Sequence, residues 1–242
     1  MANAPKSVLI TGANKSIGYE AARRLGALGY HVWLGSRDAA RGEAAAKTLR
    51  AGGAEVRVIE LEVTDDAQVR AAAERVGKTD GKLDVLINNA GIAGEIALPS
   101  AQSVDSVKTV YETNVYGPIR VTQAFLPLLK AAGEANIVMV SSGLGSLTKH
   151  SDPADPVSAR NILGYDTSKT ALNSITVAFA KELRDSGIKV NAADPGYTKT
   201  DFNNHQGHRT VEQAAEVIVR LATLGADGPT GGFFDDAGVM PW

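Results

Sequence analysis

Short apolar runs alternate along this chain with segments whose apolar residues recur at helical spacing. The first run, from Lys6 to Thr11, ends at Gly12, and the segment from Ile17 to Leu28 then has helical period. Strands that alternate with helices pair in parallel, because each helix carries the chain back across the sheet. The sequence therefore predicts an α/β fold, a doubly wound parallel sheet of about seven strands with helices on both faces.

The same alternation continues to the end of the chain. Further strands are expected at 31–35, 55–60, 83–88, 135–141, 188–193 and 231–234. Further helices are expected at 39–51, 66–79, 164–186 and 210–223, with two more within 100–131. The polar segment from Thr148 to Asn161 contains two prolines and two aspartates, which predicts a loop or a small excursion and not a linker between domains.

Composition narrows the class of protein. A chain of 242 residues with 44% hydrophobic content can bury one large core, so a single domain is expected. The formal net charge of -2, with no basic patch, argues against nucleic acid as a partner. The absence of cysteine excludes disulfides, thiolate nucleophiles and thiolate metal sites.

The N-terminus gives no sign of a targeting segment. Met1 to Pro5 runs directly into the apolar run Val8 to Ile10, which leaves no room for a signal peptide. No stretch of about 18 apolar residues is present. A cytoplasmic location and no membrane partner are therefore the expected default.

The turn from Thr11 to Gly18 joins the first expected strand to the first helix. Free backbone N–H groups and the helix dipole can hold a pyrophosphate there, and glycines permit its close approach. An ordinary strand-to-helix turn is the alternative. In a doubly wound sheet, ligands bind beyond the carboxyl ends of the strands, where this turn and Arg37, Asn88, Ser142 and Pro195 are all expected.

Tyr165 and Lys169 lie four residues apart in an expected helix and therefore share one face. A cation beside the phenol favours its ionised form and makes it a usable proton donor. Such a pair arises often by chance, so its meaning depends on Asn114 and Ser142 upstream.

Taken in order, these motifs resemble the short-chain dehydrogenase/reductase family over nearly the whole chain. They are the Thr11–Gly18 turn, Asn88–Gly91, Asn114, Ser142, Tyr165 with Lys169, and Pro195–Gly196. Finer features are similar to the NADPH-dependent carbonyl reductase branch, namely Asn14–Lys15, Ser36–Asp38 and the terminal Trp242. The resemblance implies one Rossmann-type domain over 1–242, with a nucleotide-binding half of about 1–90 and a catalytic and substrate half of about 91–242.

Cofactor choice depends on the end of the second strand, where an acid would repel a 2′-phosphate. Ser36 stands there and Arg37 follows; its guanidinium can grip phosphate, and Lys15 could add a second positive charge. NADP(H) is therefore expected over NAD(H). Asp38 could instead mark an NAD site, but its place before an alanine-rich helix favours an N-cap.

The chain departs from the family's pattern at two cofactor positions. Ser16 replaces the middle glycine of the turn, and we expect it to keep the turn with tighter geometry. Glu62 with Val63 stands where the family has an aspartate near the adenine, which leaves that contact open. The resemblance implies cofactor contacts at Gly12, Asn14, Lys15, Ser16, Ile17, Gly18, Arg37, Glu62, Val63, Asn89, Ala90, Gly91, Tyr165, Lys169, Pro195, Gly196, Thr198 and Thr200.

The resemblance also assigns catalytic roles. Tyr165 would give a proton to the carbonyl oxygen, and Ser142, with Ser141 as the fallback, would hold that oxygen. Lys169 and the positive charge of the oxidised nicotinamide would together lower the pKa of Tyr165. Lys169 would also bond the nicotinamide ribose, and Asn114 would order a water for a proton relay. A mid-helix asparagine is otherwise more often solvent-facing or locally bonded.

An apolar ketone or aldehyde is the expected substrate. Residues from Thr198 to about Arg209 are expected to form a mobile lid. The expected pocket wall consists of Ile92, Ala93, Leu144, Leu147, Tyr197 and Phe202. The four histidines offer no metal-site pattern, and no Gly-x-Ser-x-Gly motif is present, so neither a metal site nor a hydrolase of that type is expected.

The leading hypothesis is a reversible, NADPH-dependent reduction of a ketone or aldehyde. A 3-oxoacyl or quinone reductase of the same family is the alternative enzyme, and a non-catalytic NADP(H)-sensing protein is the alternative from another class. A homodimer or homotetramer is possible, because relatives often pair the helices that correspond to 115–131 and 164–186. The segment between Ser142 and Tyr165 could cover that surface.

Overall fold

The computed structural model describes residues 5–242, which form one sheet of seven parallel strands in the order β3-β2-β1-β4-β5-β6-β7. This is the doubly wound order, so the predicted fold class is confirmed. The expectation about the N-terminus rests largely on residues 1–4, which lie outside the described part. The strands are β1 (Ser7–Ile10), β2 (His31–Ser36), β3 (Val56–Glu60), β4 (Val85–Asn88), β5 (Ala135–Val140), β6 (Ile188–Ala193) and β7 (Phe233–Phe234).

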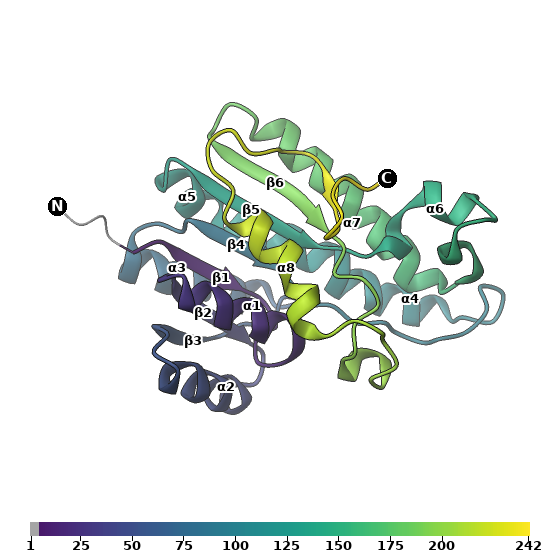
Figure 1. Ribbon diagram of the computed structural model, residues 1–242. Helices are drawn as coiled ribbons and strands as arrows, with labels where there is room; N and C mark the ends of the chain where they lie inside the picture. The colour runs from purple at the N-terminus through teal and green to yellow at the C-terminus, as the bar shows by residue number, and fades with distance from the viewer. Residues whose placement is uncertain (1–4) are drawn as a thin grey trace.

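Helices cover both faces of the sheet (Figure 1). One face carries α1 (Ser16–Ala27), α2 (Ala39–Ala51) and α8 (Val211–Ala222). The other carries α3 (Asp66–Asp80), α5 (Gly117–Ala131) and α7 (Leu163–Glu182). Smaller elements are α4 (Val104–Tyr111), α6 (Leu147–Ser151) and the short helices η1 (Glu112–Tyr116), η2 (Gly143–Gly145), η3 (Pro156–Ala159) and η4 (Asp201–Asn203).

Alternation within the strands divides the apolar residues between two cores. Val8 and Ile10 of β1 belong to the core beneath α1 and α8, whereas Leu9 between them belongs to the core beneath α3, α5 and α7. All three side chains are fully buried. Because both faces are covered, the central strands β1, β4 and β5 consist mostly of apolar residues, as is usual in parallel sheets.

Two predicted segments differ in detail from the structure. The region 100–131 is a nearly continuous run of α4, η1 and α5, and η1 is a π-helical turn, which inserts an extra residue into the helix. The segment from Thr148 to Asn161 contains most of α6 and all of η3. Of the two expectations for it, a loop or a small excursion from the sheet, the second describes it better.

The carboxyl ends of the strands meet at one edge, where α6, the N-terminal end of α7 and the segment around η4 gather (Figure 1). The residues that follow β1, β2, β4, β5 and β6 therefore face a common region. Within residues 5–242, no helix combines the length and apolarity that a membrane crossing demands.

Candidate active site

The turn after β1 is fastened to the end of β4. The Thr11 hydroxyl accepts hydrogen bonds from the N–H groups of Asn89 (2.9 Å) and Ala90 (3.0 Å). The Asn89 amide donates to the carbonyls of Thr11 (2.9 Å) and Gly12 (3.1 Å). Gly12 has a φ of +63°, which suits a residue without a Cβ. A Cβ on Gly18 would lie 2.5 Å from the Asn89 Nδ2, so this turn requires glycine there too.

Ser16, the departure from the family's glycine, begins α1 with a φ of +53°. A serine therefore stands in the left-handed region that glycine adopts without strain. The residue before it, Lys15, differs from expectation. Its ammonium lies 2.7 Å from the Asp201 carboxylate, so its positive charge is paired with the segment around η4.

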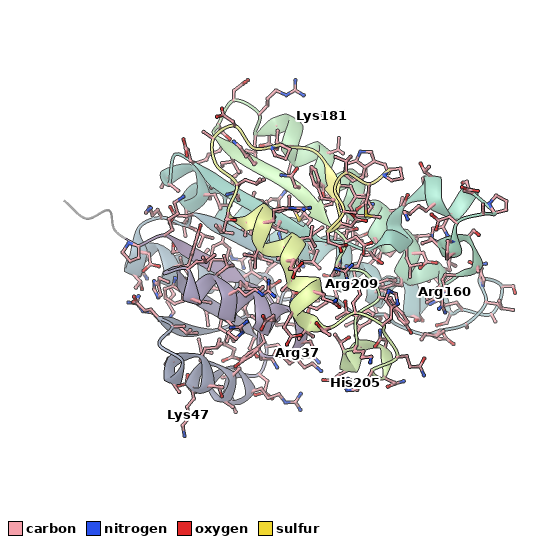
Figure 2. All side chains as sticks on the ribbon, viewed as in Figure 1. Arg37, Lys47, Arg160, Lys181, His205 and Arg209 are labelled. Atoms are coloured by element: carbon pink, nitrogen blue, oxygen red, sulfur yellow. The ribbon has the colours of Figure 1, made fainter. Side chains whose placement is uncertain are left out.

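The end of β2 is built as the sequence predicts. Asp38 accepts a hydrogen bond from the N–H of Arg41 at 2.9 Å and caps α2, which confirms the N-cap interpretation. The buried Ser36 hydroxyl donates to the Asp38 carbonyl. Arg37 is exposed and has no ion pair among the described residues. Figure 2 shows it on the same side of the molecule as His205, whereas Lys47 projects from the far side of α2.

Glu62 and Val63 follow β3 in different settings. Glu62 Oε1 accepts a hydrogen bond from the N–H of Thr64 at 3.2 Å, which ties this carboxylate to its own turn. Val63 is 4% exposed, and a Cβ on Gly117 would lie 2.9 Å from it. Val63 is therefore a packing residue between β3 and the start of α5.

Asn114 lies fully buried in the π-helical turn η1. Its side chain exchanges two hydrogen bonds of 2.9 Å with the backbone of Ile92 and donates to the Ser168 hydroxyl at 3.0 Å. A Cβ on Gly91 would lie 3.3 Å from its Oδ1 and 3.7 Å from Lys169 Nζ. The alternative that Asn114 faces solvent is therefore wrong. Asn114 lies beside Lys169.

The two serines after β5 have different surroundings. The Ser141 hydroxyl is buried and donates to Asn173 Oδ1 at 2.6 Å, so it braces α7. Ser142 caps η2, accepts from the N–H of Leu144 at 3.2 Å and keeps some exposed surface. Hydrogen bonding by Ser142 also lowers the pKa of Tyr165. Ser142 is thus the serine that faces the tyrosine.

Tyr165 and Lys169 share one face of α7, with the ammonium 5.6 Å from the centre of the phenol ring. Lys169 is 4% exposed and donates to the carbonyl of Val140 at 2.8 Å. Burial lowers its pKa to about 8, and the charge of Asp194 opposes this. Lys169 can therefore exchange a proton near neutral pH.

The pKa of the Tyr165 phenol is raised, although the Lys169 ammonium lies nearby. Burial raises its pKa well above the ordinary value, hydrogen bonding by Ser142 opposes the rise, and the charges of Asp194 and Asp166 add to it. In the protein by itself the pKa is therefore raised, and its lowering by Lys169 together with the oxidised nicotinamide stays a prediction. Tyr165 is protonated across the neutral range, which is the form that can donate a proton.

The segment after β6 closes on itself near the tyrosine. Gly196 has a φ of +71°, and the buried Thr198 hydroxyl donates to the carbonyl of Gly196 at 3.1 Å. A β-bridge between Thr198 and Arg209 joins the two ends of the expected lid. The buried Thr200 is the N-cap of η4, and its N–H donates to Asn203 Oδ1 at 3.4 Å.

Residues of the expected pocket wall are only partly gathered. The ring of Phe202 lies 5.5 Å from that of Tyr165, so it faces the catalytic pair. Tyr197 packs instead against His208 and Arg160. Leu147 is 61% exposed on α6, and Leu144 contributes its carbonyl to a contact with His150.

Sequence reasoning missed Asp194 and Asn173. Asp194 is the first residue after β6, so the rule that singled out Pro195 applied equally to it. Its carboxylate accepts a hydrogen bond from the N–H of Gly196 at 2.9 Å. Asn173 follows Lys169 by one turn of α7 and bonds both Ser141 and the carbonyl of Gly145. No sequence signal distinguished it.

Comparison with known proteins gives a consistent result. The family model described as short chain dehydrogenase matches residues 6–210. The chain is 37% identical over 225 residues to the short-chain dehydrogenase anuI of Penicillium roqueforti, covering 90% of this chain and 89% of the relative. It is 30% identical to carbonyl reductase [NADPH] 1 of Sus scrofa over an alignment of 278 positions, which covers 100% of this chain and 96% of the relative.

A solved structure has the same fold. The NADPH-bound carbonyl reductase from chicken fatty liver superposes with a TM-score of 0.87 at 32% identity. The match covers 98% of this chain and 99% of that one. The resemblance that the motifs indicated is therefore confirmed across the whole length of the chain.

Replacing Gly18 by alanine tests how tightly the turn is built. The added Cβ would also lie 2.9 Å from the Gly12 carbonyl, so we expect a loss of about 1–3 kcal/mol in the free energy of unfolding, measured with urea. NADPH binding should weaken with it. Gly225→Ala is the matched control, because nothing lies within 4 Å of its Cβ position, and it should stay within about 0.5 kcal/mol. An unchanged Gly18→Ala protein would contradict the described packing.

Proposed function

Because the chain belongs to the short-chain dehydrogenase family, we propose that it is an NADP(H)-dependent oxidoreductase that reduces a ketone or aldehyde to an alcohol, reversibly. The observation that carries the proposal is the meeting of Tyr165 with Ser142 and the buried Lys169 at the carboxyl edge of the sheet. These are the groups that a carbonyl reduction needs, namely a proton donor, a hydrogen-bond donor for the oxygen and a cation.

NADP(H) fits the residues on the other half of this edge. In the turn after β1, Gly12 and Gly18 pack closely against Asn89 and Ala90. The turn leads into the N-terminus of α1, where a pyrophosphate is favoured. Arg37, which follows β2, is exposed and has no ion pair within residues 5–242, so it suits a 2′-phosphate. Asp38 is occupied as an N-cap. Lys15 can join Arg37 only by leaving Asp201.

When bound, NADPH supplies the hydride for the carbonyl carbon. Tyr165 then donates its proton to the carbonyl oxygen, on which negative charge develops. The raised pKa of Tyr165 ensures that this proton is present at neutral pH. Ser142 holds the same oxygen by a hydrogen bond, which orients the carbonyl and stabilises the developing charge.

Lys169 and Asn114 serve Tyr165 after the transfer. The Lys169 ammonium stabilises the phenolate that remains, and its pKa of about 8 allows proton exchange near neutrality. Asn114 lies beside this ammonium and orders a water that returns the proton. The same groups run in reverse for alcohol oxidation, so the cofactor ratio sets the direction.

The proposed substrate is a small apolar carbonyl compound. Phe202 presents an aromatic face beside the phenol of Tyr165, while Leu147 and Tyr197 keep exposed surface at the same end of the molecule. The rest of the pocket wall and the other expected cofactor contacts stay predictions. So does the mobility of the lid from Thr198 to about Arg209. The division near residue 90 into cofactor and substrate halves, a homodimer or homotetramer, and a cytoplasmic location belong to the same proposal.

Replacing Tyr165 by phenylalanine should abolish reduction while NADPH binding persists. The phenol supplies the proton, and general acids of this kind contribute about 10²- to 10⁴-fold to the rate. We expect kcat to fall by a factor in that range, measured as NADPH oxidation with an apolar ketone. Tyr30→Phe, before β2 at the opposite end of the sheet, controls for loss of a hydroxyl. Full turnover by Tyr165→Phe would contradict the assigned role.

Replacing Arg37 by alanine should reduce the preference for NADPH over NADH. The guanidinium would lose a charged hydrogen bond to the 2′-phosphate, which corresponds to about a 10- to 100-fold loss in kcat/KM for NADPH. The value for NADH should change little. Arg184→Ala, an exposed arginine after α7, removes the same charge elsewhere. Equal losses with both cofactors would exclude a 2′-phosphate contact.

A further inference from the structure

Asp194 stands directly after β6, at the carboxyl edge of the sheet that also carries Tyr165 and Lys169. Its charge raises the pKa of both groups. Its backbone N–H continues the pairing of β6 by donating to the carbonyl of Phe234 at 2.8 Å, which fixes the residue at the end of the strand. Its side chain then turns toward the loop after β5. The proposed mechanism gives the Asp194 carboxylate no role.

The Asp194 carboxylate lies between two loops. Its Oδ1 accepts from the N–H of Gly196 at 2.9 Å, in the turn after β6. Its Oδ2 lies 3.0 Å from the point where a Cβ on Gly143 would stand, and the Gly143 N–H is close enough to lower the carboxyl pKa. Gly143 directly follows Ser142. One carboxylate therefore touches the serine loop and the Pro195–Gly196 turn together.

The serine loop is also packed against Lys169 directly. A Cβ on Gly145 would lie 2.8–3.0 Å from atoms of Lys169, so the two backbones are in close contact. The carbonyl of Gly145 accepts from Thr170 at 3.1 Å and from Asn173 at 3.2 Å. Movement of this loop would therefore displace both the hydroxyl of Ser142 and the face of α7 that carries the catalytic pair.

Charge gives the carboxylate a second effect. Burial raises the pKa of Asp194, and the N–H groups of Gly196 and Gly143 counter this by favouring the ionised form. Other charges that act on it are Asp235 after β7 and Lys149 of α6. From α7, Lys169 and Tyr165 both sense its charge, which raises the pKa of each. An ionised Asp194 thus favours the protonated form of both groups.

We propose that Asp194 is a positioning residue, which clamps the loop of Ser142 to the turn of Gly196 and presents its carboxylate to Lys169 and Tyr165 of α7. The inference rests on the proposed function for its catalytic meaning. Its structural content, a carboxylate that fixes two loops and acts on a buried ammonium, belongs to the folded protein with or without turnover.

Asp194→Asn keeps the size of the side chain and removes its charge. Because Asp194 raises the pKa of Lys169, the variant should titrate Lys169 at lower pH than the parent protein, measured by NMR of the lysine side-chain signals and assigned with Lys169→Arg. Asp185→Asn, an exposed aspartate after α7, removes the same charge at the opposite end of the sheet and should change nothing. An unshifted Lys169 in Asp194→Asn would overturn the proposal.

Kinetics supply the second readout. Reduction needs protonated Tyr165, so activity falls as pH rises through the pKa values of the pair. The basic limb of the pH profile of kcat/KM should therefore move to lower pH in Asp194→Asn, and kcat should fall about tenfold while the Kd of NADPH stays nearly constant. A fall in kcat with an unmoved limb would reduce Asp194 to a structural clamp and contradict its electrostatic part.

Asp194→Ser repeats both measurements if the asparagine variant fails to fold, because serine is smaller and can still accept from Gly196. It should give the same direction of shift in Lys169. The NMR titration requires no substrate. A parent protein without turnover would therefore defeat the proposed function, whereas the Lys169 titration would still decide the role of Asp194.

Discussion

The hydrogen bond from the Lys169 ammonium to the Val140 carbonyl, 2.8 Å long, is the contact on which the site depends. A buried ammonium is tolerated only where polar groups replace its water. Here the last carbonyl of β5 takes that place, so the end of a strand fixes the face of α7 that carries Tyr165. Because α7 is held there, Ser142 can meet it from the loop after β5 and Asn114 can meet it from η1.

The two halves of the carboxyl edge are built differently. The cofactor half relies on backbone, since Gly12 and Gly18 allow the turn to pack closely against Asn89 and Ala90, and hydrogen bonds of Thr11 and Asn89 hold it there. The substrate half relies on side chains of short elements such as Phe202, which leave exposed apolar surface. Rigid backbone supports one shared cofactor, while variable loops can fit different carbonyl compounds. The same division explains why cofactor chemistry is easier to assign than substrate.

Much of the fold follows from local patterns, because apolar periodicity and caps such as Asp38 act within a few residues. The site follows from sequence where it depends on position after a strand, as for Ser142. Where distant segments meet, the site cannot be predicted from local sequence. The pairing of Lys15 with Asp201, for example, joins residues that are 186 positions apart. The raised pKa of Tyr165 and the contact of Asp194 with Gly143 depend on burial, which no short motif reports.

In the proposed reaction, hydride passes from NADPH to a carbonyl carbon at this edge of the sheet. NADPH with deuterium at the transferable C4 position, incubated with a panel of apolar ketones and aldehydes, tests it directly by mass spectrometry and NMR of the products. The account predicts an alcohol with deuterium on the former carbonyl carbon, formed faster from NADPH than from NADH. Tight NADPH binding with no label in any product would contradict it and favour a cofactor-sensing protein.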